Sequence, residues 1–132
     1  MLATDDFIIL FLDLLNEVLT SAIVVVAASL LLYNLSKNLD NRVARTSAIV
    51  LACVTVAYAA DAFIALEPTR NIHIATLRLQ WIGIAFLPAA LLHLSDALLA
   101  TTGLPSRGRR KRIIRILYGV SGTFLAMAGL TN

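Results

Sequence analysis

The sequence predicts an all-α, polytopic membrane protein with four transmembrane helices. Hydrophobic residues make up 59% of the 132 residues and charged residues only 14%, and the apolar residues gather in four stretches separated by short polar segments. A helix needs about 20 residues to cross a bilayer core of about 30 Å, and each stretch is close to that length. A soluble domain of this size could not bury so much apolar surface. We therefore expect one transmembrane helical domain over residues 1–132, with spans at about 7–33, 43–66, 77–100 and 113–130.

The first span, 7–33, is expected to remain in the protein after membrane insertion. A secretory signal peptide opens with basic residues ahead of its apolar core. This chain instead opens with Asp5 and Asp6, and no Lys or Arg precedes the span. The apolar stretch is also longer than the core of a signal peptide. We interpret it as a retained transmembrane helix whose N-terminus is translocated.

The loops that flank the second and third spans predict the orientation. The first loop holds Lys37, Arg42 and Arg45, whereas the second holds Arg70 opposed by Glu67. The third loop is the most basic and holds Arg107, Arg109, Arg110, Lys111 and Arg112. Because basic loops stay on the cytoplasmic side, loops one and three are predicted to be cytoplasmic. Both termini are then extracytoplasmic, and the chain is a multi-pass protein of the cell (inner) membrane.

The third loop carries turn residues as well as charge. Gly103, Pro105 and Gly108 are expected to prevent the third helix from continuing into the fourth. The basic residues anchor the topology or, alternatively, bind anionic lipid headgroups at about 1 kcal/mol per residue. Because they lie between spans, orientation explains the net charge of +3, and no nucleic-acid partner is expected.

Polar residues near the outer ends of three spans form a candidate intramembrane cluster. Asp13, Asn16 and Glu17 share one face of the first span, because their spacings are three and four. Asp61 lies near the outer end of the second span and Arg78 near that of the third. The cluster is expected to hold the helices in register through ion pairs, or to form an outward-facing pocket for a cationic or polar ligand. A third alternative is that the first helix begins near Leu14, which leaves Asp13 in water.

His93 and Asp96 form a candidate polar pair toward the inner end of the third span. Three residues apart, they are neighbours on one helical face. Such a pair could relay a proton, or both residues could reach the cytoplasmic interface and meet the basic third loop. Two ligands are too few for a metal site, and no second His lies in a span, since His73 is assigned to the outer loop. No metal and no cofactor are expected.

Two further features concern how the spans bend and pack. Pro88 lies in the middle of the third span and is a candidate hinge, because proline removes a backbone hydrogen bond and kinks a helix. Small residues let helix backbones approach closely in lipid, and Cys53, Ala57 and Asp61 form such a stripe on the second span. That stripe is expected to face another helix. The fourth span has a similar side, expected to pack on a helix of this chain or of another, made of Gly119, Gly122, Ala126 and Gly129.

The third and fourth spans resemble part of a known signalling region. The elements are Gln80-Trp81-Ile82-Gly83, Pro88 five residues on, and Thr131-Asn132 at the end of the fourth span. This pattern is similar to the N-terminal seven-helix sensor region of bacterial histidine kinases, and it covers the first four helices only. The resemblance implies a role in sensing, an outside N-terminus and a kinase domain further along a longer protein.

The sequence favours a non-catalytic sensory or signal-input module, as part of a longer signalling protein. No catalytic motif is present, so no enzymatic activity is expected of this chain itself. The alternative is a small accessory or structural subunit, packed against other transmembrane helices in a large photosynthetic or respiratory membrane complex. An enzyme or a transporter ranks third, and paired repeats around a midplane site, which a transporter usually has, are not evident.

Overall fold

The computed structural model describes residues 2–37, 40–66, 69–104 and 108–130, with side chains from residue 6 onward. It contains four helices, α1 (Leu2–Lys37), α2 (Arg42–Ile64), α3 (Arg70–Thr101) and α4 (Gly108–Leu130). The described residues contain no strand, which confirms the all-α class. All four helices are long and apolar enough to cross a membrane.

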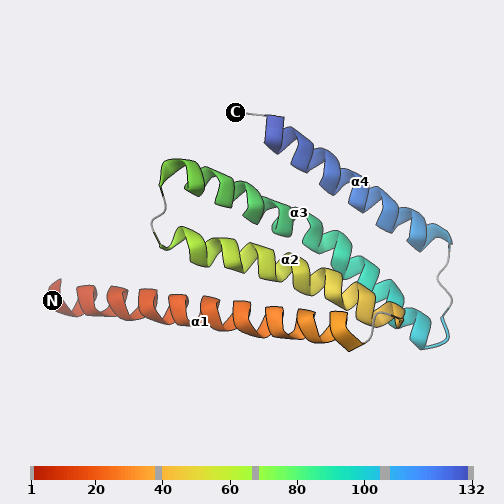
Figure 1. Ribbon diagram of the computed structural model, residues 1–132, viewed down its shortest axis with the longest axis horizontal. Helices are drawn as coiled ribbons and strands as arrows, with labels where there is room; N and C mark the ends of the chain where they lie inside the picture. Colours follow the sequence, from red (N-terminus) through yellow and green to blue (C-terminus); the bar gives the residue numbers. More distant parts are fainter. Residues whose placement is uncertain (1, 38–39, 67–68, 105–107, 131–132) are drawn as a thin grey trace.

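The four helices form an open array rather than a closed bundle. Among the described residues, α1 packs on α2, α2 on α3 and α3 on α4, and no other pair of helices is in contact. Consecutive helices run in opposite directions, as short connections between them require. The N-terminal end of α1 and the C-terminal end of α4 therefore lie at the same end of the array (Figure 1).

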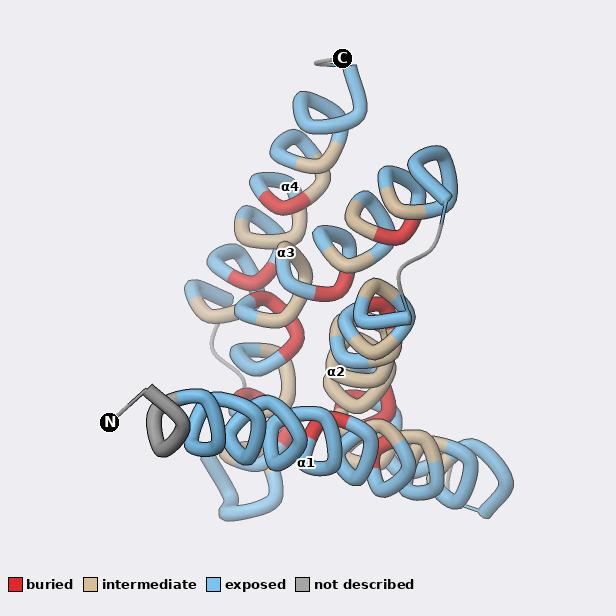
Figure 2. Tube along the Cα trace, turned by 90° about the vertical axis from the view of Figure 1, so that its left-hand side faces the viewer, coloured by how far each residue is buried: buried red, intermediate tan, exposed pale blue. Residues whose placement is uncertain are grey.

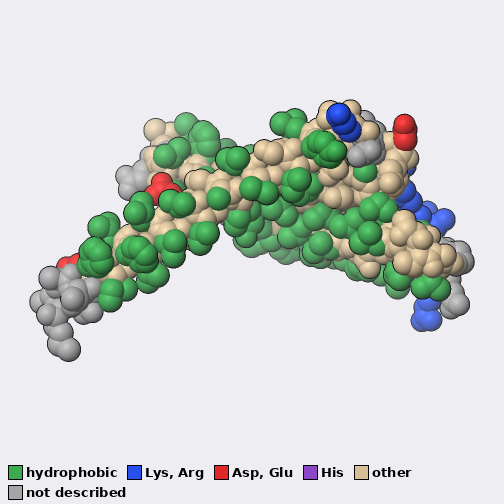
Figure 3. Space-filling model, turned by 90° about the horizontal axis from the view of Figure 1, so that it is seen from below, with side chains coloured by type: hydrophobic (Ala, Val, Ile, Leu, Met, Phe, Trp, Pro, Cys, Tyr) green, Lys and Arg blue, Asp and Glu red, His purple; other side chains and the backbone are tan. Residues whose placement is uncertain are grey.

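Much of the apolar surface faces outward. Large side chains such as Phe7, Leu10, Val25 and Leu32 are more than half exposed. Figure 3 shows hydrophobic side chains along the visible face and Lys and Arg side chains gathered at one end. An apolar surface of this extent is stable only when lipid or other apolar helices cover it. The chain is therefore a multi-pass membrane protein in contact with the bilayer.

The helices extend further than the predicted spans. The first begins at Leu2 and includes Asp13, so the alternative that it begins near Leu14 is wrong. The third begins at Arg70, which places His73 in its first turn and not in a loop. The basic residues from Arg109 to Arg112 were assigned to the third loop, but they belong to the beginning of α4. Arg and Lys are good helix formers, so a helix readily continues from its apolar span into the polar interface.

Local sequence signals set several helix ends. The side chain of Asn41 caps α2 by accepting a hydrogen bond from the Val43 amide at 3.0 Å. After α3, Gly103 has a φ of +80°, and the Leu104 amide donates to the Leu99 carbonyl at 3.3 Å. This left-handed glycine cap stops α3 where the sequence predicted a stop. Glu67, Pro105, Arg107, Thr131 and Asn132, which entered the sequence predictions, lie outside the described residues.

The closest approach between two helices is that of α2 and α3. A Cβ added at Gly83 would lie 2.6 Å from the Cys53 carbonyl oxygen and 3.2 Å from the Ala57 Cβ, so only glycine fits. The stripe of small residues on the second span therefore faces another helix, as predicted. Figure 2 shows buried residues on all four helices, and α3 has more of them than any other helix among the described residues. Most of the buried apolar residues on α2 and α3 are alanines: Ala48, Ala60, Ala89, Ala90 and Ala97.

The glycine-rich side of α4 is not used in the same way. A Cβ added at Gly119, Gly122 or Gly129 would meet no atom within 4 Å. Instead, α4 packs on α3 through a different side, on which Ile114 and Ser121 are buried. Among the described residues, no helix of this chain therefore packs closely on these glycines, although Gly129 lines the cleft between α3 and α4.

Candidate functional site

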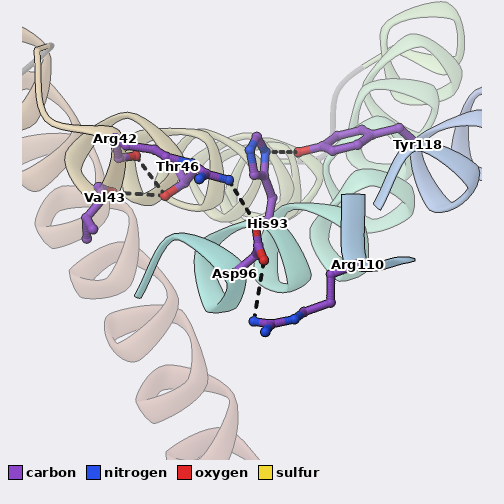
Figure 4. A network of polar contacts seen from close by, with 7 residues as sticks. All are labelled: Arg42, Val43, Thr46, His93, Asp96, Arg110 and Tyr118. Atoms are coloured by element: carbon purple, nitrogen blue, oxygen red, sulfur yellow. Dashed lines mark hydrogen bonds and ion pairs between the residues drawn. The ribbon is translucent and has the colours of Figure 1, made fainter. Parts of the chain in front are cut away.

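Asp96 of α3 is the charged residue that the fold buries most deeply among the described residues, with 2% of its surface exposed. Its Oδ2 accepts a hydrogen bond from Arg42 Nη2 at 2.8 Å, and its Oδ1 lies 3.6 Å from Arg110 Nη1. Arg42 is the first residue of α2, and Arg110 lies in the first turn of α4. One carboxylate thus joins three helices at the end of the array where α2 and α4 begin (Figure 4). We call these three residues the Asp96 bridge and this end the basic end.

The charges of the Asp96 bridge are consistent with its position. A carboxylate removed from water is costly unless cations and hydrogen bonds compensate it. Asp96 reaches toward the N-terminal ends of two helices, where the helix dipole also favours negative charge. The same dipole disfavours Arg42 and Arg110 at these positions, so both guanidinium groups gain from a neighbouring carboxylate. The bridge therefore satisfies three charged groups that would each be unfavourable alone.

The two halves of the bridge differ in strength. Arg42 makes a hydrogen bond at 2.8 Å, whereas Arg110 Nη1 is buried and has no hydrogen-bond partner. A cavity of about 50 Å³ lies beside this second contact, lined by Asp96, Arg110, Ser95 and Ile113. The attachment of α4 to the bridge is therefore the looser of the two, and the cavity leaves the Arg110 side chain room to move.

His93 lies one turn before Asp96 on α3 and contacts a different neighbour. Its Nδ1 is 3.5 Å from the Tyr118 hydroxyl oxygen, and the two rings meet edge to face with centroids 6.1 Å apart. Tyr118 also packs against Phe86, with centroids 6.3 Å apart. Of the predicted polar pair, Asp96 meets the basic residues as one interpretation required, whereas His93 belongs to an aromatic contact with α4 (Figure 4).

Near Pro88, α3 receives a hydrogen bond from α4. The helix continues through Pro88 without interruption, and the Ser121 hydroxyl donates to the Ala85 carbonyl at 2.7 Å. Proline has no amide hydrogen, so the Ile84 carbonyl loses its usual donor and the neighbouring carbonyls become accessible to other groups. The Ser121 hydroxyl bonds the carbonyl next to the freed one, and such interhelical bonds are common near prolines in membrane helices. The predicted hinge is therefore held from outside by Ser121.

A second polar feature lies at the opposite end, between α1 and α2. It is a cleft of about 400 Å³ that we call the acidic cleft, and four of the predicted residues line it, the carboxylates Asp13, Glu17 and Asp61 and the amide Asn16. All three carboxylates are exposed. Thr20, which is 7% exposed, lies in the same lining. The Gln80 side chain approaches Asp61 Oδ1 at 3.5 Å and so connects the cleft to α3.

Arg78, the basic residue of the predicted cluster, does not line the acidic cleft. It is exposed and lines another cleft, between α3 and α4, together with Trp81 and Leu125. The five residues of the predicted cluster are thus divided, with three carboxylates and Asn16 in one cleft and Arg78 in the other.

Some contacts were not anticipated from the sequence. The sequence indicated Arg42 only as a topology signal, although the buried carboxylate at the inner end of the third span calls for a cation at its level. Gly83 was noted only as part of a motif, and Ser121 was not considered. In the structure, these residues make the contacts that join the helices.

Among the residues that the structure describes, no group of three or more His, Cys, Asp or Glu side chains is placed to hold a metal ion. No protein-family model matches this chain, and neither a curated protein nor a solved structure matches it.

Proposed function

We propose that this chain is a non-catalytic signal-input module of a membrane protein, in which α4 moves relative to the α2–α3 pair. A signal can shift such an equilibrium only by interacting differently with its two states. The single observation that carries the proposal is the asymmetry of the Asp96 bridge, which is tight toward α2 and loose toward α4. Such a contact can be made or lost without disturbing the rest of the array.

The acidic cleft is the proposed site of input. Three exposed carboxylates around a cleft of about 400 Å³ favour an organic cation or another polar ligand. Gln80 connects Asp61 to α3, and α3 carries both Pro88 and Asp96. A displacement of Asp61 would therefore act on the same helix that holds the bridge.

The orientation is part of the proposal. Basic segments stay in the cytoplasm, and the basic end holds Lys37, Arg42, Arg109 and Arg110. With that end cytoplasmic, the acidic cleft and both termini are extracytoplasmic, in the inner membrane. The exposed basic residues would then lie at the level of anionic headgroups. This arrangement suits the resemblance to the sensor region of histidine kinases, in which a longer chain would carry the kinase.

Spin-label distances test whether α4 moves. Ile49 of α2 and Ile116 of α4 are exposed, and labels there, in a Cys53→Ala background, would report the α2–α4 separation in lipid. We expect two distances whose populations change on addition of spermidine. The change should disappear in Asp61→Asn and persist in Asp6→Asn, which removes a carboxylate outside the cleft. A single distance that spermidine leaves unchanged would contradict the proposal.

The second candidate is an accessory subunit of a larger membrane complex. It is favoured by the glycine-rich side of α4, where Gly119 and Gly122 have open space beside them and a helix from another chain would fit. The intact mass of the protein isolated from its own membranes separates the two. A 14.2 kDa species bound in fixed ratio to large partners would favour the subunit. A longer polypeptide with a kinase domain would favour the signal-input module.

A further inference from the structure

The Arg110 half of the Asp96 bridge borders a small cavity between α3 and α4. The cavity has a volume of about 50 Å³, and the Asp96 carboxylate and the Arg110 guanidinium group form the charged part of its lining. Figure 4 shows these two side chains directed toward each other. The rest of the lining consists of Ser95 and of four apolar residues, Leu92, Leu99, Ile113 and Ile114. The cavity is therefore small, mostly apolar and charged at one place.

The two charged groups are too far apart for a direct hydrogen bond. Arg110 Nη1 lies 3.6 Å from Asp96 Oδ1, whereas N–H···O bonds extend to about 3.2 Å. Among the described residues, Nη1 is buried and has no acceptor, and a buried charged donor without an acceptor is strongly unfavourable. A carboxylate oxygen has two lone pairs, so Oδ1 can accept a further hydrogen bond. An atom about 2.9 Å from both groups fits beside the line that joins them, because 3.6 Å is shorter than twice this distance.

The opposite charges of the two groups select the chemistry of the occupant. It must accept a hydrogen bond from the guanidinium group and donate one to the carboxylate. A halide ion would accept from Arg110 but would lie against the negative carboxylate, and a metal cation would bind the carboxylate but would lie against the guanidinium group. Water has both a lone pair and a proton to share. A cavity of about 10–15 Å³ or more admits a water molecule when it provides two to four polar partners, and this cavity meets both conditions.

We propose that the cavity is the site of an ordered water molecule, which accepts a hydrogen bond from Arg110 Nη1 and donates one to Asp96 Oδ1. In this arrangement, α2 is joined to Asp96 directly, through the 2.8 Å bond from Arg42, and α4 is joined to it through water. The Arg110 side chain is 30% exposed, so the water can exchange with the aqueous phase at the basic end. The inference does not require α4 to move, and it therefore stands or falls separately from the signal-input function.

The test measures how fast polarisation passes from water protons to aspartate carboxyl carbons in a water-edited solid-state NMR experiment. The full chain, with isotopically labelled aspartate, is reconstituted in lipid, and the Asp96 and Asp40 signals are identified by their loss in Asp96→Asn and Asp40→Asn. Asp40 is exposed, whereas Asp96 is 2% exposed. A buried carboxylate without water beside it receives polarisation several-fold more slowly than an exposed one. We expect Asp96 to receive it as fast as Asp40 does.

Two variants locate the water. In Ile114→Phe, a larger side chain at a buried position of the lining fills the cavity, and transfer to Asp96 should become several-fold slower. In Ile116→Phe, the new side chain lies at an exposed position outside the lining, and transfer should be unchanged. Arg42 does not line the cavity, so polarisation relayed through its exchangeable protons is the same in both variants. Circular dichroism establishes that both variants retain their helix content.

Three results would overturn the proposal. Slow transfer to Asp96 in the wild-type chain, a result that needs no variant, would mean that the cavity is dry. Fast transfer that persists in Ile114→Phe would place the water outside the cavity. A nitrogen NMR shift of the Arg110 guanidinium group that depends on the chloride concentration would identify an anion as the occupant.

Discussion

The two sides of α3 are held to their neighbours by different means. Toward α2, the backbones meet at Gly83 against Cys53 and Ala57, and small buried residues continue the contact. Toward α4, the contact is made by separate side chains, among them Ser121 and Tyr118, and it gives way to an apolar cleft beyond Trp81. The α2–α3 and α3–α4 contacts share α3 and the same bilayer. Small residues form the first contact, whereas larger side chains form the second.

This difference follows from how helices associate in lipid. Apolar side chains gain little by leaving lipid for one another, so close packing and interhelical hydrogen bonds must stabilise the contact. Glycine and alanine permit close packing over many atoms, each of which adds a small dispersion energy. The larger side chains of α4 keep its backbone at a distance and leave single polar contacts to hold it. We therefore expect α2 and α3 to behave as one rigid pair, and α4 to be the movable element.

The largest effect is expected from Asp96→Ala, which removes a group that both sides of α3 share. The change leaves Arg42 and Arg110 without their carboxylate, and breaking a buried ion pair from one side costs about 3–5 kcal/mol. Equilibrium unfolding in detergent, followed by circular dichroism, measures the loss of stability. Asp40→Ala, which removes an exposed carboxylate near the same end, serves as the control. A loss below about 1 kcal/mol would show that the bridge does not join the helices.

A smaller effect, confined to the α2–α3 side, is expected from Gly83→Ala. The new Cβ would lie 2.6 Å from the Cys53 carbonyl oxygen, so the helices must move apart. Overpacking of this kind costs about 1–3 kcal/mol. Gly122→Ala is the matched control, since its Cβ meets nothing within 4 Å and alanine has the higher helix propensity. That variant should be neutral or more stable by up to about 1 kcal/mol.

Equal responses of the two glycine variants in unfolding experiments would remove the distinction between the two sides of α3. The distinction would be sharpened if Gly83→Ala also weakened the protection of α2 amides from hydrogen exchange while leaving those of α4 unchanged.

The smallest effect is expected from Ser121→Ala, on the α3–α4 side. Loss of the hydrogen bond to the Ala85 carbonyl should cost about 0.6–1 kcal/mol, the typical value for such bonds between membrane helices. The spin-label distance between Ile49 and Ile116 should broaden because α4 is held less firmly. Thr123→Ala is the control, because the Thr123 hydroxyl bonds only to carbonyls of its own helix. Similar broadening in both variants would argue against a specific role for Ser121.

The sequence was sufficient for the helices and for features that depend on residues close in the chain. Apolar runs predicted four membrane-spanning helices, and the turn chemistry of Gly103 predicted the end of the third. Spacing placed Asp13 and Glu17 on one side of α1, where the structure finds them in one cleft. The helix ends were placed less well, because Arg109 and its neighbours extend a helix beyond its apolar core as readily as they form a loop.

Contacts between residues far apart in the chain could not be read from the sequence in the same way. Asp96 and Arg42 are 54 residues apart, and only the antiparallel register of α2 and α3 brings them together. Arg78 was grouped with Asp61 by its depth in the membrane, but depth does not specify which side of α3 a residue occupies. The structure places Gln80 beside Asp61 and Arg78 in the cleft toward α4.

The restriction of each helix to contacts with its chain neighbours has a consequence for biosynthesis. A topology of this kind has a low contact order, so no helix must wait for a distant segment before it can pack. The α1–α2 hairpin can assemble as soon as α2 has entered the membrane, and α3 and α4 can then add in turn as the ribosome delivers them. A chain arrested after α3 would already contain every α1–α2 and α2–α3 contact, including the Gly83 crossing and the Arg42–Asp96 ion pair.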